Sequence, residues 1–293
     1  MKTINKQGRA GNILIGMLLL LMAVIMVYPV LYCVAYSLSD SMQVMIHPVS
    51  FFTVCFTLDN YMLIFQNPAI YRSFFVSVAR TVCGIVYTLL ITGLASYAIS
   101  KKTLPGRKLL SWYLLIPMYV SGGLIPMYVL IYKLNLINNI LVYIIPNGFA
   151  TFYMLLMRTY FESLPDSLEE AARLDGAGDL TIFFKVIMPL SRPIVATVAM
   201  YIGVWQWNTW LDANLYITKF ELLPMQSILQ KMLLESFSSD LQAQAQLALG
   251  AQGTSPETLR MAAVVVSTIP IVCIYPFFQK YFAKGVMIGA VKQ

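Results

Sequence analysis

Six apolar segments, each long enough to cross a lipid bilayer, constrain the fold of this chain. They cover residues 11–38, 73–99, 109–132, 136–157, 194–211 and 261–282. About 20 apolar residues suffice for one crossing, because a helix rises about 1.5 Å per residue. The chain has 293 residues and only 11% of them are charged, whereas about a quarter are charged in a soluble domain. We therefore expect an all-α integral membrane protein, a bundle of six transmembrane helices in one domain over residues 1–293.

The basic residues gather at the ends of these segments and predict the orientation of the chain. Lysine and arginine are enriched in cytoplasmic loops. With a cytoplasmic N-terminus, the outer segments hold few basic residues, namely Arg72, Lys133, Lys219, Lys231 and Arg260. The cytoplasmic segments hold many more, namely Lys2, Lys6, Arg9, Lys101, Lys102, Arg107, Lys108, Arg158, Arg173, Lys185, Arg192, Lys280, Lys284 and Lys292. We therefore expect both termini and the loop 158–193 in the cytoplasm, and the loop 212–260 outside. The same distribution explains the net charge of +7 without nucleic-acid binding.

The first apolar segment is expected to be retained as a span. Its apolar region is longer than that of a secretory signal peptide, and no small-residue cleavage site follows it. Proline and glycine predict kinks in later spans, where neighbouring helices can satisfy the freed backbone groups. These residues are Pro117, Gly122, Gly123 and Pro126 in the third span, Pro146, Asn147 and Gly148 in the fourth, and Pro270 and Pro276 in the sixth.

A polar stretch, PDSLEEAARLDGAGDLTIFFKVIMPLSRP, occupies residues 165–193 between the fourth and fifth spans. The spacing of Asp166 with Glu169, or of Ser167 with Glu170, is that of a capping box. Such a box satisfies the free N–H groups in the first turn of a helix. A short helix is therefore expected to begin here.

Two glycines and a proline predict how this stretch continues. Gly176 and Gly178 are expected to end the first helix, because glycine tolerates the left-handed conformation of a C-terminal cap. Asp179 is expected to cap a second short helix over 180–187, which ends at Pro189. The result is a protruding pair of short helices around a glycine elbow. On spacing alone, an ordinary surface helix-turn-helix fits equally well.

The residue pattern of this stretch resembles a known one. Residues 170–172 (Glu-Ala-Ala), Gly176 and residues 186–189 (Val-Ile-Met-Pro) resemble the EAA loop of ABC-importer permeases. The pattern of that loop is E-A-A, three residues, Gly, nine residues and I-x-L-P. Val186 and Met188 depart from it by apolar exchanges that should keep the packing. The resemblance implies a coupling helix that docks on an ATPase through Glu169, Glu170, Ala171, Ala172, Asp175 and Gly176.

Other motifs extend the resemblance over nearly the whole chain. On them the chain is similar to the MalG-like permeases of the maltose-transporter inner-membrane family. It looks closest to the branch that imports complex oligosaccharides, including uronate-containing sugars such as those derived from alginate or pectin. The resemblance implies a type I ABC importer permease fold and a place in the bacterial inner membrane. The motifs are Pro29, Asp59-Asn60-Tyr61, Ala95-Ser96-Tyr97-Ala98 ahead of Lys101-Lys102, and the runs 275–282 and 284–292.

The same resemblance implies partners. The chain would be one of two unlike permease subunits, working with two ATP-binding subunits and an extracytoplasmic sugar-binding protein. It contains no G-x-x-x-x-G-K-[ST] phosphate-binding loop, so it is not expected to be an enzyme itself. ATP and Mg²⁺ are therefore expected on the partner ATPase subunits. The C-terminal run 285–292 is expected to reach towards them.

Candidate sugar contacts lie in the fifth and second spans. Trp205 can stack on sugar C–H surfaces, while Gln206 and Asn208 can pair with hydroxyl groups. However, tryptophan is also enriched at membrane interfaces, and amides also bond between helices. Arg80 lies within the second span, where it either faces the pathway and favours an anionic sugar, or snorkels to the interface. No catalytic residue and no metal ligand is predicted.

Other functions remain to be weighed against this one. An ion- or proton-coupled secondary transporter would need an ionisable site at mid-membrane depth, and no acidic residue lies in any predicted span. An enzyme would need a clustered nucleophile, base or metal set, and the chain has a single histidine, His47. A structural or signalling subunit without transport could carry the same polar loop. The segment 212–260 is expected either to dock the binding protein or to cap the bundle.

Overall fold

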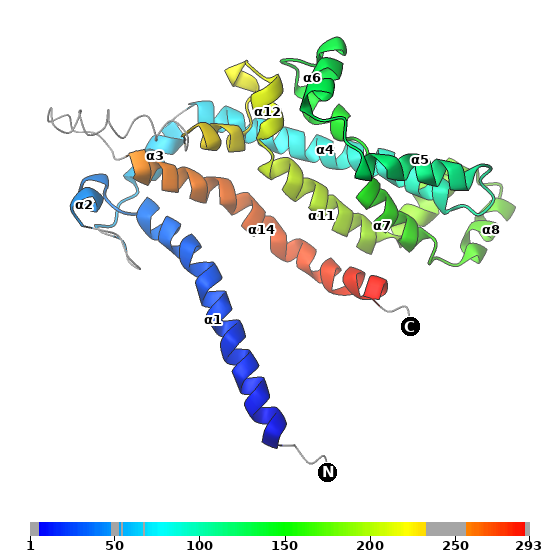
Figure 1. Cartoon of the computed structure of the whole chain (residues 1–293), viewed down its shortest axis with the longest axis horizontal. Helices are drawn as coiled ribbons and strands as arrows, with labels where there is room; N and C mark the ends of the chain where they lie inside the picture. Colours follow the sequence, from blue (N-terminus) through cyan, green and yellow to red (C-terminus); the bar gives the residue numbers. More distant parts are fainter. Residues whose placement is uncertain (1–5, 48–52, 54, 67, 233–255, 291–293) are drawn as a thin grey trace. The chain divides into compact units, whose positions relative to one another are not determined.

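The computed structural model describes residues 6–47, 53, 55–66, 68–232 and 256–290 (Figure 1). This part of the chain is helical apart from its connections and one isolated bridge between Ser39 and Phe56. Three helices are long and apolar enough to cross a membrane, and three bent helix pairs would bring the number to six if each pair is one crossing. The all-α expectation is confirmed for the described residues, and the number of six crossings stays a prediction.

The chain divides into two compact units. The first comprises Met1–Pro68 and Lys231–Ile269, and the second comprises Ala69–Gln230 and Pro270–Gln293. The first unit contains α1 (Lys6–Ser37), α2 (Ser41–Ile46), α3 (Asp59–Gln66) and the beginning of α14 (Pro256–Ala290). The second contains the rest of α14 together with α4 (Pro68–Ser100), α5 (Arg107–Tyr119), α6 (Leu124–Lys133), η1 (Ile140–Tyr143), η2 (Ile145–Asn147), α7 (Thr151–Phe161), α8 (Asp166–Leu174), α9 (Asp179–Ile182), η3 (Phe183–Ile187), α10 (Met188–Leu190), α11 (Arg192–Asn208), α12 (Leu211–Tyr216) and η4 (Phe220–Leu222).

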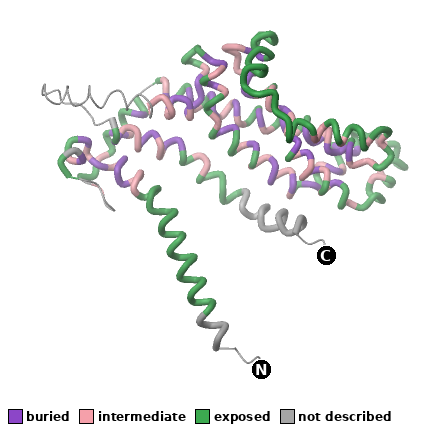
Figure 2. Tube along the Cα trace, in the orientation of Figure 1, coloured by how far each residue is buried: buried purple, intermediate pink, exposed green. Residues whose placement is uncertain are grey.

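In the first unit, Asn60 fixes the corner that follows α1. Its side-chain amide is buried and donates hydrogen bonds to the carbonyl groups of Ser37 and Ser39, each at 3.0 Å. Its Oδ1 accepts from Ser41 Oγ at 3.2 Å. The most apolar stretch of α1 is exposed along its length (Figure 2). The asparagine of the Asp-Asn-Tyr motif therefore has a structural role at the end of a span that presents its apolar surface outward.

The third predicted span is not one helix. α5 and α6 meet at 113°. Gly123 lies between them at φ 83° and ψ 179°, a conformation essentially restricted to glycine. The kink predicted from the prolines and glycines is confirmed, but it is much sharper than a bend in a continuous helix.

The fourth and fifth predicted spans also differ from continuous helices. Over 136–157 the chain forms the 3₁₀ turns η1 and η2 and then α7, with a bend of 51° at the predicted Pro146-Asn147-Gly148 kink. α7 runs on to Phe161, beyond the predicted end at residue 157, and Arg158 and Glu162 form an ion pair one helical turn apart at this end. α11 ends at Asn208, three residues before the predicted end of the fifth span.

The first helix of the polar loop, α8, ends in a Schellman motif. The backbone N–H of Gly176 donates to the carbonyl of Arg173, and that of Ala177 donates to the carbonyl of Ala172, both at 3.0 Å. Gly176 has φ +80°, as this cap requires, so the predicted glycine stop is confirmed. Ala172 is the third-last residue of the helix and Gly176 is the glycine of its cap. The geometry of the cap therefore sets the spacing between these two residues of the motif.

The predicted N-terminal caps of this loop are wrong. α8 has Pro165 at its N-cap and no side-chain capping bond. The carboxylates are engaged elsewhere, because Asp166 pairs with Lys102 at 3.3 Å and Glu169 pairs with Lys101. Asp179 likewise does not cap α9.

Gly178 is the N-cap of α9, and Asp179 pairs instead with Arg173 at 2.6 Å. α9, η3 and α10 then follow one another without a break, so Pro189 does not end the second short helix. η3 is a π-helical turn, and its wider spacing accommodates a proline whose ring would clash with the carbonyl four residues earlier in a regular α-helix. The chain turns instead at Ser191, where it bends by 86° into α11.

A buried cluster joins this loop to the spans. Phe183 is fully buried, and its ring lies 5.4 Å from that of Tyr97, centroid to centroid. A Cβ atom at Gly93 would lie 3.3 Å from both Phe183 and Met157, so the glycine allows close approach. The cluster draws on α4, α7, α9, η3 and α11 and contains Tyr97, Met157, Phe161, Ile182, Phe183, Ile187, Ile194, Val198 and Ile202.

Replacing Gly176 with alanine should loosen the end of α8. Alanine in the left-handed conformation costs about 1–2 kcal/mol, although an added Cβ meets no atom within 4 Å. Hydrogen exchange followed by mass spectrometry should show the amides of residues 176 and 177, which donate the two bonds of the cap, losing protection by about 5–30-fold. Gly178→Ala is the matched control, because Gly178 has φ −76° and equally open surroundings. Equal loss of protection in the two variants would contradict the strain at Gly176.

Candidate functional site

The solvent-facing side of α8 and its C-cap combines two carboxylates without an ion pair among the described residues, Glu170 and Asp175, with apolar side chains. Glu170 is exposed and forms no ion pair with any described residue. Leu174 is 89% exposed and Leu180, at the start of α9, is 65% exposed. Ala172 faces the other way and packs against the buried cluster. The loop therefore presents an acidic and apolar surface on a helix whose opposite side packs against the buried cluster.

Ion pairs hold the same helix against the end of α4. Glu169 pairs with Lys101, whose ammonium group lies 3.9 Å from the centroid of the Tyr97 ring. Asp166 pairs with Lys102 nearby. The cationic residues that close α4 thus neutralise two of the loop's carboxylates. Glu170 is left available for a partner.

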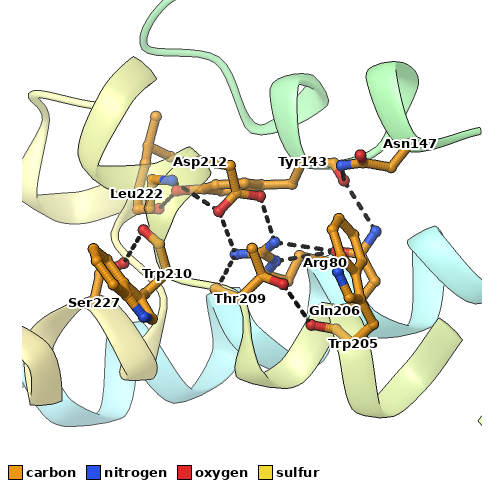
Figure 3. Close-up of polar contacts among 11 residues, drawn as sticks. Arg80, Tyr143, Asn147, Trp205, Gln206, Thr209, Trp210, Asp212, Leu222 and Ser227 are labelled. Atoms are coloured by element: carbon orange, nitrogen blue, oxygen red, sulfur yellow. Dashed lines mark hydrogen bonds and ion pairs between the residues drawn. The ribbon is translucent and has the colours of Figure 1, made fainter. Parts of the chain in front are cut away.

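A second polar centre surrounds Arg80, in the first half of α4 (Figure 3). Arg80 is fully buried, and its Nη1 and Nη2 donate to the two carboxylate oxygens of Asp212 at 3.3 and 2.6 Å. Nη1 also donates to the carbonyl of Thr209 at 3.0 Å, and Nε and Nη2 donate to Gln206 Oε1 at 3.3 and 3.1 Å. The guanidinium lies over the Tyr143 ring, 4.3 Å from its centroid. Each part of the cation therefore has an interaction partner.

Gln206 extends this network to η1. It is fully buried and donates from Nε2 to the carbonyl of Tyr143 at 3.0 Å. A Cβ atom at position 84 would lie 2.5 Å from the same nitrogen, so Gly84 leaves room for the amide. The Tyr143 hydroxyl donates to the carbonyl of Leu222 at 2.8 Å. The network thus ties α4, α11, η1, α12 and η4 together.

An open hollow of about 700 Å³ lies beside the end of α11. None of its lining residues is charged. Trp205 is 44% and Trp210 37% exposed, and the rings of Tyr153 and Tyr201 stack at a centroid distance of 6.4 Å. Aromatic faces with a few polar groups are typical of binding surfaces for organic ligands. The lining residues are Tyr153, Met200, Tyr201, Val204, Trp205, Asn208, Thr209, Trp210 and Leu211.

The structure separates the four residues predicted for the substrate pathway. Trp205 and Asn208 line the hollow, whereas Arg80 and Gln206 are fully buried behind it. The alternative that Arg80 snorkels to the interface is wrong, because Asp212 neutralises it inside the protein. Asp212 was assigned to the outer loop and its role was missed. The sequence signal for this ion pair is an arginine without a partner in one predicted span and an acidic residue directly after the end of another predicted span.

Part of the predicted outer loop lies within the described residues. Residues 212–232 form α12, η4 and a helix over 225–232, and Met225 N–H donates to Ser77 Oγ at 2.8 Å. Residues 233–255, with most of the glutamine-rich and glycine-rich sequence, lie outside the described residues. Within the described part, no group of His, Cys, Asp and Glu is arranged to hold a metal ion.

A family model of binding-protein-dependent transport system inner membrane components matches residues 9–288. The chain belongs to this family. It is therefore a membrane-embedded permease component of an ABC importer, and its apolar helices fit a multi-pass inner-membrane protein. Family membership also decides against a secondary transporter.

Several permeases of this family are similar over almost their full length. The polygalacturonan/rhamnogalacturonan transport system permease protein YtcP of Bacillus subtilis is 36% identical, covering 98% of this chain and 99% of that protein. Protein LplC of the same organism is 33% identical over 98% of this chain and 96% of its own length. The arabinooligosaccharide permease AraQ of Halalkalibacterium halodurans is 29% identical over 92% of each chain.

Solved structures agree with these relatives. A chain from the crystal structure of a bacterial ABC transporter involved in import of the acidic polysaccharide alginate matches with a TM-score of 0.86 and 32% identity, over 96% of this chain and 100% of that one. A chain from a bacterial alginate ABC transporter in complex with alginate pentasaccharide-bound periplasmic protein matches with a TM-score of 0.62. Its identity is 14%, over 97% of this chain and 98% of that one, so it supports the fold alone. The type I permease fold is confirmed.

Replacing Asp212 with alanine should destabilise the permease strongly. The change leaves the Arg80 cation buried without its charged partner, which costs about 3–5 kcal/mol. Denaturation in mixed micelles measures the free energy of unfolding. Glu221→Ala is the control. Glu221 pairs with Arg72, which lies on α4 like Arg80, but this pair is 3.8 Å long and exposed, and such pairs contribute about 0–1 kcal/mol. Similar small losses in both variants would contradict the buried pair.

Proposed function

We propose that this permease imports oligosaccharides, forms half of the translocation pathway and receives motion from an ATPase through the loop 158–193. The observation that carries the proposal is the construction of α8. Its exposed side offers Glu170 and Leu174, next to Leu180 on α9, while its other side is fixed to the spans by ion pairs and a buried cluster. A displacement of a helix held in this way can be transmitted to the spans, because close-packed interiors transmit strain.

The proposal includes partners on both sides of the membrane. Two ATP-binding subunits would hold ATP and Mg²⁺ and contact Glu169, Glu170, Ala171, Ala172, Asp175 and Gly176. A second, unlike permease would complete the pathway, and an extracytoplasmic binding protein would deliver the sugar. Both termini would be cytoplasmic, in agreement with the distribution of basic residues. The segment 212–260 would face the binding protein.

We further propose that the sugar is acidic. Two similar proteins support this choice, the permease named for polygalacturonan and rhamnogalacturonan and the transporter involved in alginate import. Polygalacturonan and alginate carry a carboxylate on their sugar rings. The described lining of the hollow contains aromatic and amide groups but no cation. Recognition of the carboxylates would therefore depend on the binding protein or the second permease.

Glu170→Lys should uncouple the importer. The substitution reverses an exposed loop carboxylate that forms no ion pair among the described residues, next to an apolar contact surface. In the purified complex, ATP hydrolysis stimulated by the loaded binding protein should fall by more than tenfold, or the ATPase subunits should dissociate, while the permease stays in the membrane. Asp59→Lys makes the same charge change on an exposed carboxylate of α3, outside the segment 212–260 that would face the binding protein, and should leave both properties unchanged. Normal association and transport in the Glu170 variant would contradict the coupling role.

The choice of sugar can be tested by competition. Proteoliposomes containing the full importer and its binding protein should take up oligogalacturonate or oligoalginate, and unlabelled acidic oligosaccharides should compete. Neutral malto-oligosaccharides of the same length should compete far less well. Equal competition by both classes would leave the oligosaccharide importer intact and contradict the acidic substrate.

A further inference from the structure

The turn between α11 and α12 forms one end of the aromatic hollow. α11 ends at Asn208, and Thr209 adopts an extended conformation, φ −74° and ψ 127°, so the regular helix no longer determines the path of the chain. Trp210 and Leu211 follow, and both line the hollow. The positions of these two side chains therefore depend on the contacts that hold the turn between α11 and α12.

Arg80 holds this turn from both sides. Nη1 donates to the carbonyl of Thr209, just before the two lining residues, and the guanidinium binds the carboxylate of Asp212, just after them. Asp212 Oδ1 also accepts from the backbone N–H of Ala213 at 2.8 Å, which fixes the first turn of α12. One planar cation on α4 thus brackets the Trp210-Leu211 pair (Figure 3).

The same geometry excludes direct recognition of sugar charge by Arg80 in this conformation. Its side chain is fully buried, its charge is matched by Asp212, and its donors are directed at protein acceptors. A uronate would have to displace Asp212 to reach it. The arrangement suits a support for a binding surface, because sites are held in place by residues whose own positions are locked by hydrogen bonds.

We propose that Arg80 is a positioning residue for the sugar-facing wall, and that Tyr153, Tyr201 and Trp210 extend this wall beyond Trp205 and Asn208. The wall binds the apolar faces of pyranose rings, and Arg80 sets its shape by bracketing the turn 209–212. This inference rests on the proposed oligosaccharide transport. It assigns this subunit the recognition of ring faces and leaves recognition of charge to other subunits.

The test measures sugar transported per ATP hydrolysed by the full importer in proteoliposomes, at saturating loaded binding protein. Trp210→Ala and Arg80→Lys should each lower this ratio several-fold, because lysine keeps the charge but lacks the planar fork that brackets the turn. Stimulated ATP hydrolysis and the half-saturating concentration of binding protein should stay unchanged. The double variant should show no further loss than Trp210→Ala alone, since the two residues act through one surface.

Two further variants keep the test decisive. Arg80→Met combined with Asp212→Leu removes the bracket without leaving a buried charge, a change that proteins often tolerate, and it should also lower the ratio. Thr88→Val is the control, because it removes a buried hydrogen bond from α4 to the Asn147 carbonyl without touching the turn, and its ratio should stay at the wild-type value.

Four results would overturn the inference. One is a wild-type ratio in the assembled Arg80 variants, a second is a wild-type ratio in Trp210→Ala, and a third is a loss in the Arg80 variants confined to acidic sugars. A parallel fall of assembly, ATP hydrolysis and uptake in both the Arg80→Lys and the Met–Leu variants would also overturn it, since it assigns Arg80 a role in folding only. Failure of the proposed function differs from all of these, because the wild-type complex would then move no sugar.

Discussion

The packing of Phe183 is the interaction on which the rest of the structure depends. Its fully buried ring fills the space between Tyr97 on α4 and Met157 on α7, next to Gly93. The π-helical turn in which it lies continues into the loop that carries α8. If this ring were absent, the buried cluster would lose its aromatic contact between η3 and α4, and surface ion pairs contribute too little to replace it. With it, displacement of α8 must move the interior of the spans.

α4 connects this junction with the polar loop to the opposite half of the second unit. Tyr97 and Arg80 lie about 25 Å apart along the same helix, at about 1.5 Å per residue. Near Tyr97 the helix contacts the loop through packed rings, and at Arg80 it holds the turn beside the aromatic hollow. A continuous helix is stiff over this length. Displacement of the polar loop can therefore move the residues that line the hollow, without rearranging the side chains between the two sites.

Sequence reasoning succeeded where one residue type has one structural use. Gly176 had to follow the helix end, and the prolines and glycines of the third span had to interrupt it. It failed where several partners compete for one side chain. Asp166 and Asp179 have the chemistry of helix caps, yet nearby cations bind them instead. The partner of Arg80 is 132 positions away in the chain, and no local pattern indicates such a pair. Burial, which places Arg80 and Gln206 behind the hollow, is likewise a property of the packed structure.

Contact between α8 and an ATPase subunit is the central claim, and site-specific photo-crosslinking measures it most directly. A photoreactive amino acid at position 170 of the assembled importer should capture the ATP-binding subunit, and the yield should change when ATP is bound and hydrolysed. The same probe at position 221 should not capture it. Absence of the ATPase from the products at position 170, in a complex that still transports, would contradict the account.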